Sequence, residues 1–310
     1  MYKSFALIGL TLTLFGVTES AFAATQNFTL YINAGTLPIT GNGGATLNVW
    51  GYGTTAVPVV PAPQLTVNEG DTVNITVINN HNINHNFIIK NVTTDTSAIA
   101  AGASKNYSFT APVAGSYVYS DTLDSNVNRE MGLYGAMIVK PTDGSQTAWI
   151  GGPAYDHENV WVVSEMDKPR WNDIAAAGFV VDTATYKPNY FMINGLGGFD
   201  AMMDMDTMIM GTLNTKSLVR IVNAGQFSHS LHFHGNHFQV LSINGVRQPT
   251  PFEQWDTINV PPMSTAEVLY SINQTGHYPM HVHTAQCEGA NGVYLNGAAT
   301  MIDMQQFTEE

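Results

Sequence analysis

Cysteine is almost absent from this sequence: Cys287 is the single one among 310 residues. A disulfide within the chain needs two cysteines, so a fold stabilised by internal disulfide bonds is excluded. The stability of the fold must therefore come from buried apolar side chains, which a hydrophobic content of 44% can supply. The chain is long enough for two domains of ordinary size, each with its own core.

Basic side chains are also scarce. Lysine and arginine total 11 against 24 aspartates and glutamates, which gives a formal net charge of −13. Such a surface repels phosphate groups, so neither a nucleic acid nor an anionic lipid is an expected partner. The charge is typical of a soluble protein that attracts cations.

Long apolar runs are missing except near the N-terminus. Lys3 precedes the apolar run 5–17, and Ala21, Phe22 and Ala23 follow it as a small–x–small sequence. This order is typical of a cleaved signal peptide, and the run is too short for a transmembrane helix. We expect residues 1–23 to be removed and the mature protein to be periplasmic or secreted, without a membrane span. An uncleaved membrane anchor is the alternative.

No long segment has the period of an amphipathic helix, and the best helical candidate is the short piece Trp171–Ala177. Short β-branched and aromatic runs alternate instead with clusters of Gly, Pro, Asn and Asp. This spacing predicts an all-β sandwich or barrel. Examples of the expected strands are Phe28–Ile32, Gln64–Val67, Thr72–Ile78, Asn86–Ile89, Asn106–Phe109 and Ser116–Tyr119.

The two halves of the chain resemble each other. Val73–Lys90 parallels Leu218–His234, Ala114–Thr122 parallels Thr275–Thr284, and Gly135–Val139 parallels Gly297–Ile302. Self-similarity of this kind indicates two tandem domains of one fold. We predict a first domain over 24–142, a linker over 143–159, and a second domain over 160–310 that opens with a strand at Val160–Ser164.

Histidines gather in the second half, where seven of the ten lie after residue 228. Alternate side chains of a strand share a face, so His232 lies on the face of His234, and His281 on that of His283. If these two strands are neighbours, four imidazoles meet in one patch. A set of imidazoles without carboxylate or thiolate favours copper or zinc. These four histidines are the predicted metal ligands; ordinary hydrogen-bonded histidines are the alternative.

Four segments carry a resemblance to one known family: Pro61–Asn79, Tyr190–Asp200, His229–Gly245 and Tyr278–Tyr294. They resemble the multicopper oxidases over nearly the whole mature chain. The resemblance implies two tandem Greek-key cupredoxin-like β-sandwich domains and copper as cofactor. It also implies that the first histidine pair binds type 2 and type 3 copper and the second pair type 3 copper. Two-domain members are usually trimers, like the copper nitrite reductases they resemble, which implies a homotrimer here.

The family's blue copper site is incomplete in this chain. It needs a cysteine between the two histidines of the second pair, where this chain has Val282, and a histidine five residues later, where it has Cys287. Only His229 of that set remains. Without a copper–thiolate bond, no conventional blue site can take electrons from a substrate.

The first domain lacks metal ligands at the matching positions. In the repeat, His85 aligns with His229, but Ile88, Lys90, Ser120 and Thr122 stand where the second domain has its four histidines. The family completes a three-copper cluster with four histidines from a partner domain, and this chain does not offer them. Four imidazoles can hold one metal ion, or at most two.

Weaker signals have an ordinary explanation beside a functional one. Cys287 could bind a metal ion as a thiolate together with His229, in a rearranged site. The ordinary explanation is a free thiol near the surface or a small buried apolar side chain. His237 and His277 flank the cluster, as partners that orient the ligand rings or as surface residues.

Two further groups are open to the same choice. His81 and His85, four residues apart, form either a metal site or a structural pair. The five methionines within Met202–Met210 form either a loop that loads cuprous ions or flexible filling of a core or a subunit contact.

Three functions remain as hypotheses. The first is an oxidoreductase whose copper binds dioxygen or another small oxidant and receives electrons from an external donor. The second is a non-catalytic copper protein for storage, delivery or protection. The third is a structural or partner-binding module that keeps the histidines as a remnant.

Overall fold

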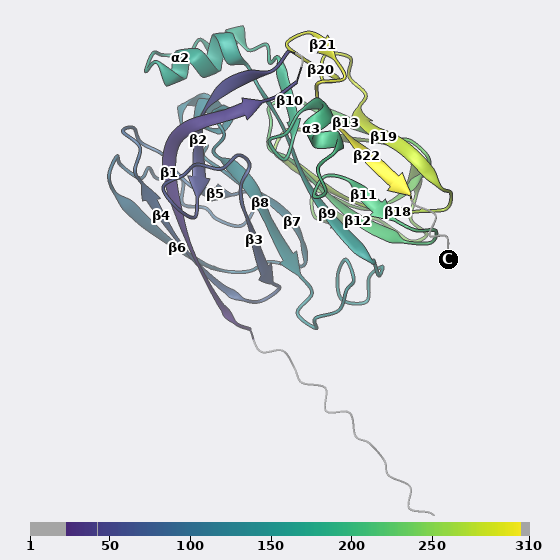
Figure 1. Ribbon diagram of the computed structural model, residues 1–310. Coiled ribbons are helices and arrows are strands. Elements are labelled where there is room, and N and C mark those ends of the chain that lie inside the picture. Colours follow the sequence, from purple (N-terminus) through teal and green to yellow (C-terminus); the bar gives the residue numbers. More distant parts are fainter. Residues whose placement is uncertain (1–22, 42, 305–310) are drawn as a thin grey trace, which may run out of the picture.

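The computed structural model describes residues 23–41 and 43–304, so the expected signal peptide lies outside the described residues except for Ala23. Two β-rich bodies lie side by side, one formed by each half of the chain (Figure 1). The prediction of an all-β protein with two tandem sandwich domains is confirmed. None of the helices in the described ranges has the length and apolar character that crossing a bilayer requires.

The first body consists of two four-stranded sheets with the strand orders β2-β1-β4-β6 and β3-β8-β7-β5. The parallel pairing of β1 with β4 and of β3 with β8 joins segments distant in sequence. The strands are β1 (Thr25–Ile39), β2 (Ala45–Gly53), β3 (Ala62–Asn68), β4 (Thr72–Asn79), β5 (Ile88–Ile89), β6 (Ser104–Thr110), β7 (Gly115–Ser120) and β8 (Tyr134–Lys140). A short 3₁₀ turn (Asp124–Asn126) and α1 (Val127–Glu130) precede β8.

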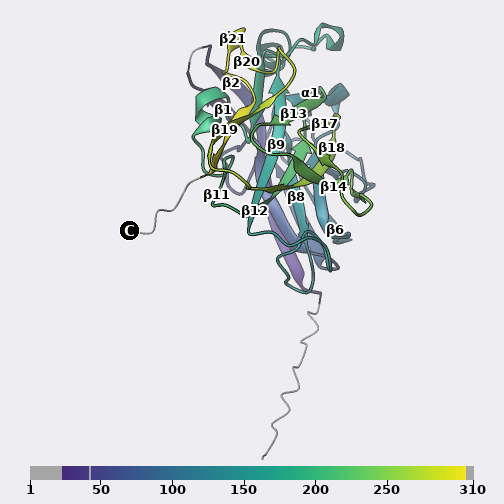
Figure 2. The same ribbon diagram turned by 90° about the vertical axis from the view of Figure 1, so that its right-hand side faces the viewer.

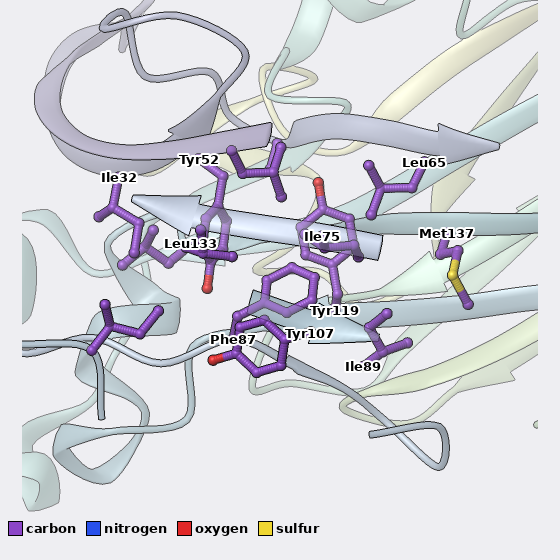
Figure 3. Packing of buried hydrophobic residues seen from close by; sticks show 14 of the residues in the cluster. Ile32, Tyr52, Leu65, Ile75, Phe87, Ile89, Tyr107, Tyr119, Leu133 and Met137 are labelled. Carbon is purple, nitrogen blue, oxygen red and sulfur yellow. The ribbon is translucent and has the colours of Figure 1, made fainter. Parts of the chain in front are cut away.

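Aromatic rings fill the space between these two sheets (Figure 3). The ring of Phe87 lies 5.7 Å from that of Tyr52 and 5.2 Å from that of Tyr119. The hydroxyls of two buried tyrosines donate to backbone carbonyls, Tyr52 to Asn86 at 2.7 Å and Tyr119 to Pro63 at 2.5 Å. Burial of large rings with their polar ends satisfied is a main source of stability for a sandwich without disulfides.

The second body has one larger sheet, in the order β10-β9-β12-β18-β14-β15 with β16 beside β14, and a second sheet in the order β11-β22-β19-β13-β17. The strands are β9 (His157–Met166), β10 (Tyr190–Ile193), β11 (Ile209–Gly211), β12 (Lys216–Asn223), β13 (His229–Phe233), β14 (Phe238–Ile243), β15 (Val246–Arg247), β16 (Gln254–Trp255), β17 (Thr257–Val260), β18 (Ser264–Ser271), β19 (Gly276–Val282), β20 (Gly289–Ala290), β21 (Val293–Tyr294) and β22 (Ala299–Met304).

The helices of the second body are short. They are a single π turn (Lys168–Asn172) that continues into α2 (Asp173–Ala176), a 3₁₀ turn (Thr183–Thr185) and α3 (Gly198–Met202). The helical piece predicted at Trp171–Ala177 corresponds to the first of these. Strand β9 begins at His157, three residues before the predicted Val160, so the end of the predicted linker is already strand.

A third apolar core joins the two bodies. Val118 and Tyr134 of the first body pack there with Val162 and Met192 of the second. The Tyr134 hydroxyl also donates to Ser164 Oγ at 2.8 Å. At one end of the molecule, the turn between β1 and β2 lies close to the hairpin β20–β21 (Figures 1 and 2). The two bodies therefore form a continuous structure, and the histidine strands lie in the second.

Candidate metal centre

Strands β13 and β19 bring the two predicted histidine pairs together. They pair antiparallel, with His232 directly opposite His281 and Leu231 opposite Val282. Leu231 and Val282 are fully buried in the second core. Because side chains alternate along a strand, the two histidines point to the other face. His234 and His283, each two residues further along its chain segment, join them there.

The four imidazole rings form one cluster. Nε2 of His234 lies 3.2 Å from Nε2 of His281. Two nitrogens that bind one ion at about 2.0–2.1 Å with a tetrahedral angle are about 3.3 Å apart. This pair therefore already has the spacing of two ligands of one metal ion. The ring centroids are separated by 4.7 Å (His232–His234), 5.2 Å (His232–His283), 5.3 Å (His234–His281), 5.5 Å (His281–His283) and 5.7 Å (His232–His281).

Hydrogen bonds outside the cluster orient two of the rings. Nδ1 of His281 lies 3.0 Å from Oε1 of Glu288, and Nδ1 of His232 lies 2.8 Å from Oγ1 of Thr257. A carboxylate only accepts hydrogen bonds, so His281 donates from Nδ1 and its Nε2 carries the lone pair. Imidazoles that bind metals are commonly held this way by a carboxylate or hydroxyl partner.

The contact between His234 and His281 needs either a hydrogen atom or a cation between the two nitrogens. Two lone pairs repel each other at 3.2 Å, so either a proton on His234 or a bound cation must lie there. Burial, followed by the neighbouring histidines, lowers the pKa of His234. The charged imidazolium form of His234 is therefore disfavoured, and the neutral ring can either donate from Nε2 to His281 or bind a metal ion through that nitrogen.

Within residues 23–41 and 43–304, no three His, Cys, Asp or Glu side chains already surround a single point with their donor atoms. The strand register places the backbone of the four histidines close together, but the ring of His232 is oriented edge-on to the three neighbouring rings. Rotation of His232 and His283 about their side-chain bonds is needed to bring a third and a fourth nitrogen to an ion between His234 and His281. The donor set fits copper or zinc.

A cavity of about 360 Å³ opens beside the cluster. Met202 from α3 and Met301 from β22 line it together with His234, His281, Tyr294 and Leu295. Tyr294 and Leu295 are exposed to solvent. Two thioethers and two imidazoles thus face one opening, which gives a small molecule or an ion a route to the rings.

The methionine segment is not part of a core. Met203 and Met205 are 58% and 65% exposed, and Met202, Met208 and Met210 are only half-buried. The part of the ordinary explanation that places these side chains in a core is therefore wrong, because all five keep exposed surface, while filling of a subunit contact stays a prediction. Only Met202 of the five reaches the cavity beside the histidine cluster.

The side chains at the positions that correspond to the family's blue copper site are buried. Val282 is fully buried, and His229 Nε2 lies 2.7 Å from Oε2 of Glu165, also fully buried. Cys287 has no exposed surface, and burial raises the pKa of its thiol to about 12. A thiol in this state is a small apolar side chain and not a thiolate ligand, so a buried thiol is the better explanation of Cys287.

The partners of the cluster differ from those that the sequence suggests. His237 is exposed, and His277 is 72% exposed and pairs with Asp303, so both are surface residues. Thr257 and Glu288 hold the rings instead. Thr257 lies opposite His232 in the register of β13 with β17, which no sequence pattern reveals.

The first body confirms the alignment of the two repeats. Ile88 lies directly opposite Ser120 between β5 and β7, as His232 lies opposite His281 in the second body. An isoleucine and a serine cannot replace two imidazoles as ligands of copper. The histidine cluster therefore has no counterpart at this place in the first body.

Comparison with known proteins agrees with this architecture. Two family models, both described as multicopper oxidase, match residues 38–144 and 175–295. A copper-containing nitrite reductase from Alcaligenes xylosoxydans xylosoxydans is 26% identical over 245 residues, which are 72% of each chain. Laccase-7 from Oryza sativa subsp. japonica is 27% identical over 244 residues, 72% of this chain but 42% of the laccase.

The solved structure of a multicopper oxidase named mgLAC superimposes with a TM-score of 0.77 at 21% identity. The match covers 93% of this chain and 88% of that one, which shows a shared fold. The two family models together cover more than two thirds of the present sequence, one in each body. The chain therefore belongs to the multicopper oxidase family, whose cofactor is copper.

Proposed function

We propose that this chain is an exported oxidoreductase that works with a reduced copper complement. His232, His234, His281 and His283 bind its copper, and it has no blue copper. The proposal rests on one observation: two H-x-H pairs from neighbouring strands meet in a single cluster, with the nearest nitrogens 3.2 Å apart. When bound there, copper supplies one-electron chemistry between its cuprous and cupric states.

The protein's own side chains then have separate tasks. Glu288 keeps the proton on Nδ1 of His281, so that Nε2 remains available to the metal. Thr257 fixes the ring plane of His232. Because buried Val282 replaces the thiolate that would relay electrons, an external donor must approach the cluster itself. The cavity bordered by Tyr294 and Leu295 offers the space for a small donor.

A non-catalytic copper carrier is the second candidate, and the two methionines in the same cavity favour it. Thioethers prefer cuprous over cupric ions. Met202 and Met301 lie where an ion would pass on its way to His234 and His281. A protein that stores or delivers cuprous ions needs such soft ligands at the entrance, and it does not need an electron relay.

Oxygen uptake separates the two candidates. We expect the copper-loaded protein to consume oxygen when a phenol, ferrous ions or cuprous ions are added, and the metal-free protein to consume none. His281→Ala, treated with the same copper, is the control for loosely bound metal. Full copper occupancy without oxygen uptake above this control would leave the carrier as the function. A carrier should also give up its copper readily to a chelator.

The copper-loaded protein is expected to lack the intense blue absorption of a copper–thiolate bond. The reason is that Val282 occupies the cysteine position and Cys287 is a buried thiol whose pKa is raised to about 12. Paramagnetic resonance should instead show a type 2 signal from cupric ions with nitrogen ligands. An intense blue colour would contradict the assignment of ligands.

Export and oligomeric state belong to the same proposal. The N-terminal residues 1–23 have the order of a signal peptide, which supports a periplasmic or secreted protein. The family resemblance supports a homotrimer. In such a trimer, a neighbouring first domain would present Ile88 and Ser120 rather than histidines to the cluster, so the copper complement would stay small. Analytical ultracentrifugation of the purified protein tests the trimer.

A further inference from the structure

A second cavity, of about 430 Å³, lies between the first body and the α2 region of the second half, and none of the four histidines of the cluster lines it. Its walls come from β1, β2, the turn after β4, the end of α2 and the segment that follows it. Figure 1 shows α2 beside β1 and β2, whereas β13 and β19 lie in the second body. The side chains used below are Trp50, His81 and Phe179, which all line this cavity.

Asp121 anchors a chain of hydrogen bonds beneath the cavity. This fully buried carboxylate lies 2.7 Å from Nδ1 of His85 and accepts from the side chain of Asn128 at 3.0 Å. It also accepts from the backbone N–H of Asn86 at 3.2 Å and of Leu123 at 2.8 Å. Because an ionised carboxylate only accepts, His85 must donate from Nδ1, and its Nε2 is a lone pair.

The next member of the chain is His81. Its Nδ1 lies 2.9 Å from Nε2 of His85, and since that nitrogen accepts, His81 donates from Nδ1. The lone pair of His81 is then on Nε2, which has no hydrogen bond to any part of the described chain. Burial, followed by the neighbouring His85, lowers the pKa of His81 to about 4, so the ring is neutral at physiological pH.

The surroundings of His81 are aromatic and open. Its ring centroid lies 4.9 Å from that of Trp50. Phe179 and Val180 on the other side of the cavity are 72% and 95% exposed. Large apolar side chains exposed around a hollow indicate a surface that a ligand covers. The cavity thus combines apolar walls with one hydrogen-bond acceptor, Nε2 of His81. The hydrogen bonds from His81 to His85 and from His85 to Asp121 keep the proton of His81 on Nδ1.

We propose that this cavity binds a small planar molecule with an apolar ring and one hydrogen-bond donor, such as a phenol. The ring lies against Trp50 and Phe179, and the donor meets Nε2 of His81. The three residues His81, His85 and Asp121 act as a relay that keeps this nitrogen an acceptor. Nothing in the proposal depends on copper, since none of the four histidines of the cluster lines this cavity.

The test compares phenol with anisole, which has the same ring but no donor, on the metal-free full-length protein. Isothermal titration calorimetry should show phenol binding about tenfold more tightly, the contribution of one neutral hydrogen bond. His81→Phe keeps a flat ring but removes the acceptor, so phenol should fall to the affinity of anisole while anisole changes little. His237→Phe, at an exposed histidine outside the cavity, should keep the full preference.

A second variant protects the test against a failure of His81→Phe to fold. Phe179→Ala changes a side chain that is 72% exposed, so the fold should survive while phenol and anisole weaken together. Equal affinities of the wild-type protein for phenol and anisole would overturn the proposal. So would a preference that persists in His81→Phe, or phenol binding that appears only after copper is loaded. The last result would assign the ligand to the histidine cluster instead.

Discussion

Replacing His281 with alanine is expected to remove most of the copper that the protein binds. This residue lies at the middle of the cluster, with its Nε2 3.2 Å from that of His234 and its ring 5.5 Å and 5.7 Å from those of His283 and His232. The loss in affinity should exceed the roughly 10–100-fold that removal of an outer partner of a ligand costs. Copper per protein by elemental analysis, and competition with a copper chelator, measure it.

Two further variants make this result specific. His277→Ala removes a histidine that is 72% exposed and lies on the same strand but outside the cluster, so the copper content should not change. Glu288→Ala removes the partner of His281 Nδ1 and leaves all four rings. Its affinity for copper should therefore be roughly 10–100-fold below that of the unchanged protein, which is a smaller loss than in His281→Ala and a larger one than in His277→Ala. Unchanged copper stoichiometry in His281→Ala would show that the histidines are a structural remnant.

The largest loss of stability is expected from Arg220→Ala. Arg220 on β12 is fully buried, and its Nε donates to Oε1 of Glu158 at 2.7 Å while Nη1 pairs with Glu267. Glu267 also accepts from Oγ of Ser116 at 2.7 Å, which connects the two bodies. Without the arginine, buried Glu267 loses the cation with which it pairs, while Glu158 keeps its pair with Lys140. Removing one partner of such a buried ion pair costs about 3–5 kcal/mol. This is a large part of the roughly 5–15 kcal/mol by which most domains are stable.

Urea unfolding followed by circular dichroism measures this effect. The control is Arg247→Ala, because Arg247 is exposed and its guanidinium lies over the ring of Trp149 at 4.7 Å. Loss of that cation–π contact should cost no more than about 1 kcal/mol. If the midpoints of the two variants fall by similar amounts, the buried ion cluster contributes little to the stability of the fold.

Strands with one face in a core and one face toward solvent follow directly from sequence patterns, whereas β2 does not stand out. In β4, for example, buried Val73, Ile75 and Val77 alternate with more exposed side chains, and this period of two is visible in the sequence. In β2, Leu47 and Val49 face the core between the two bodies, while Trp50 and Tyr52 face the core of the first body. A strand that is covered on both faces loses its alternation, because no side needs to be polar.

The sequence alone determined which histidines share a face, since alternation along a strand is a property of the backbone. It also determined that Val282 and not a cysteine stands between His281 and His283, which is the basis for proposing a protein without blue copper. Only the tertiary structure decided what surrounds those rings. Glu288, Thr257 and Met301 reach the cluster from a loop and two other strands. Contacts of that kind depend on strand pairing and loop paths, which bring together residues that no local period connects.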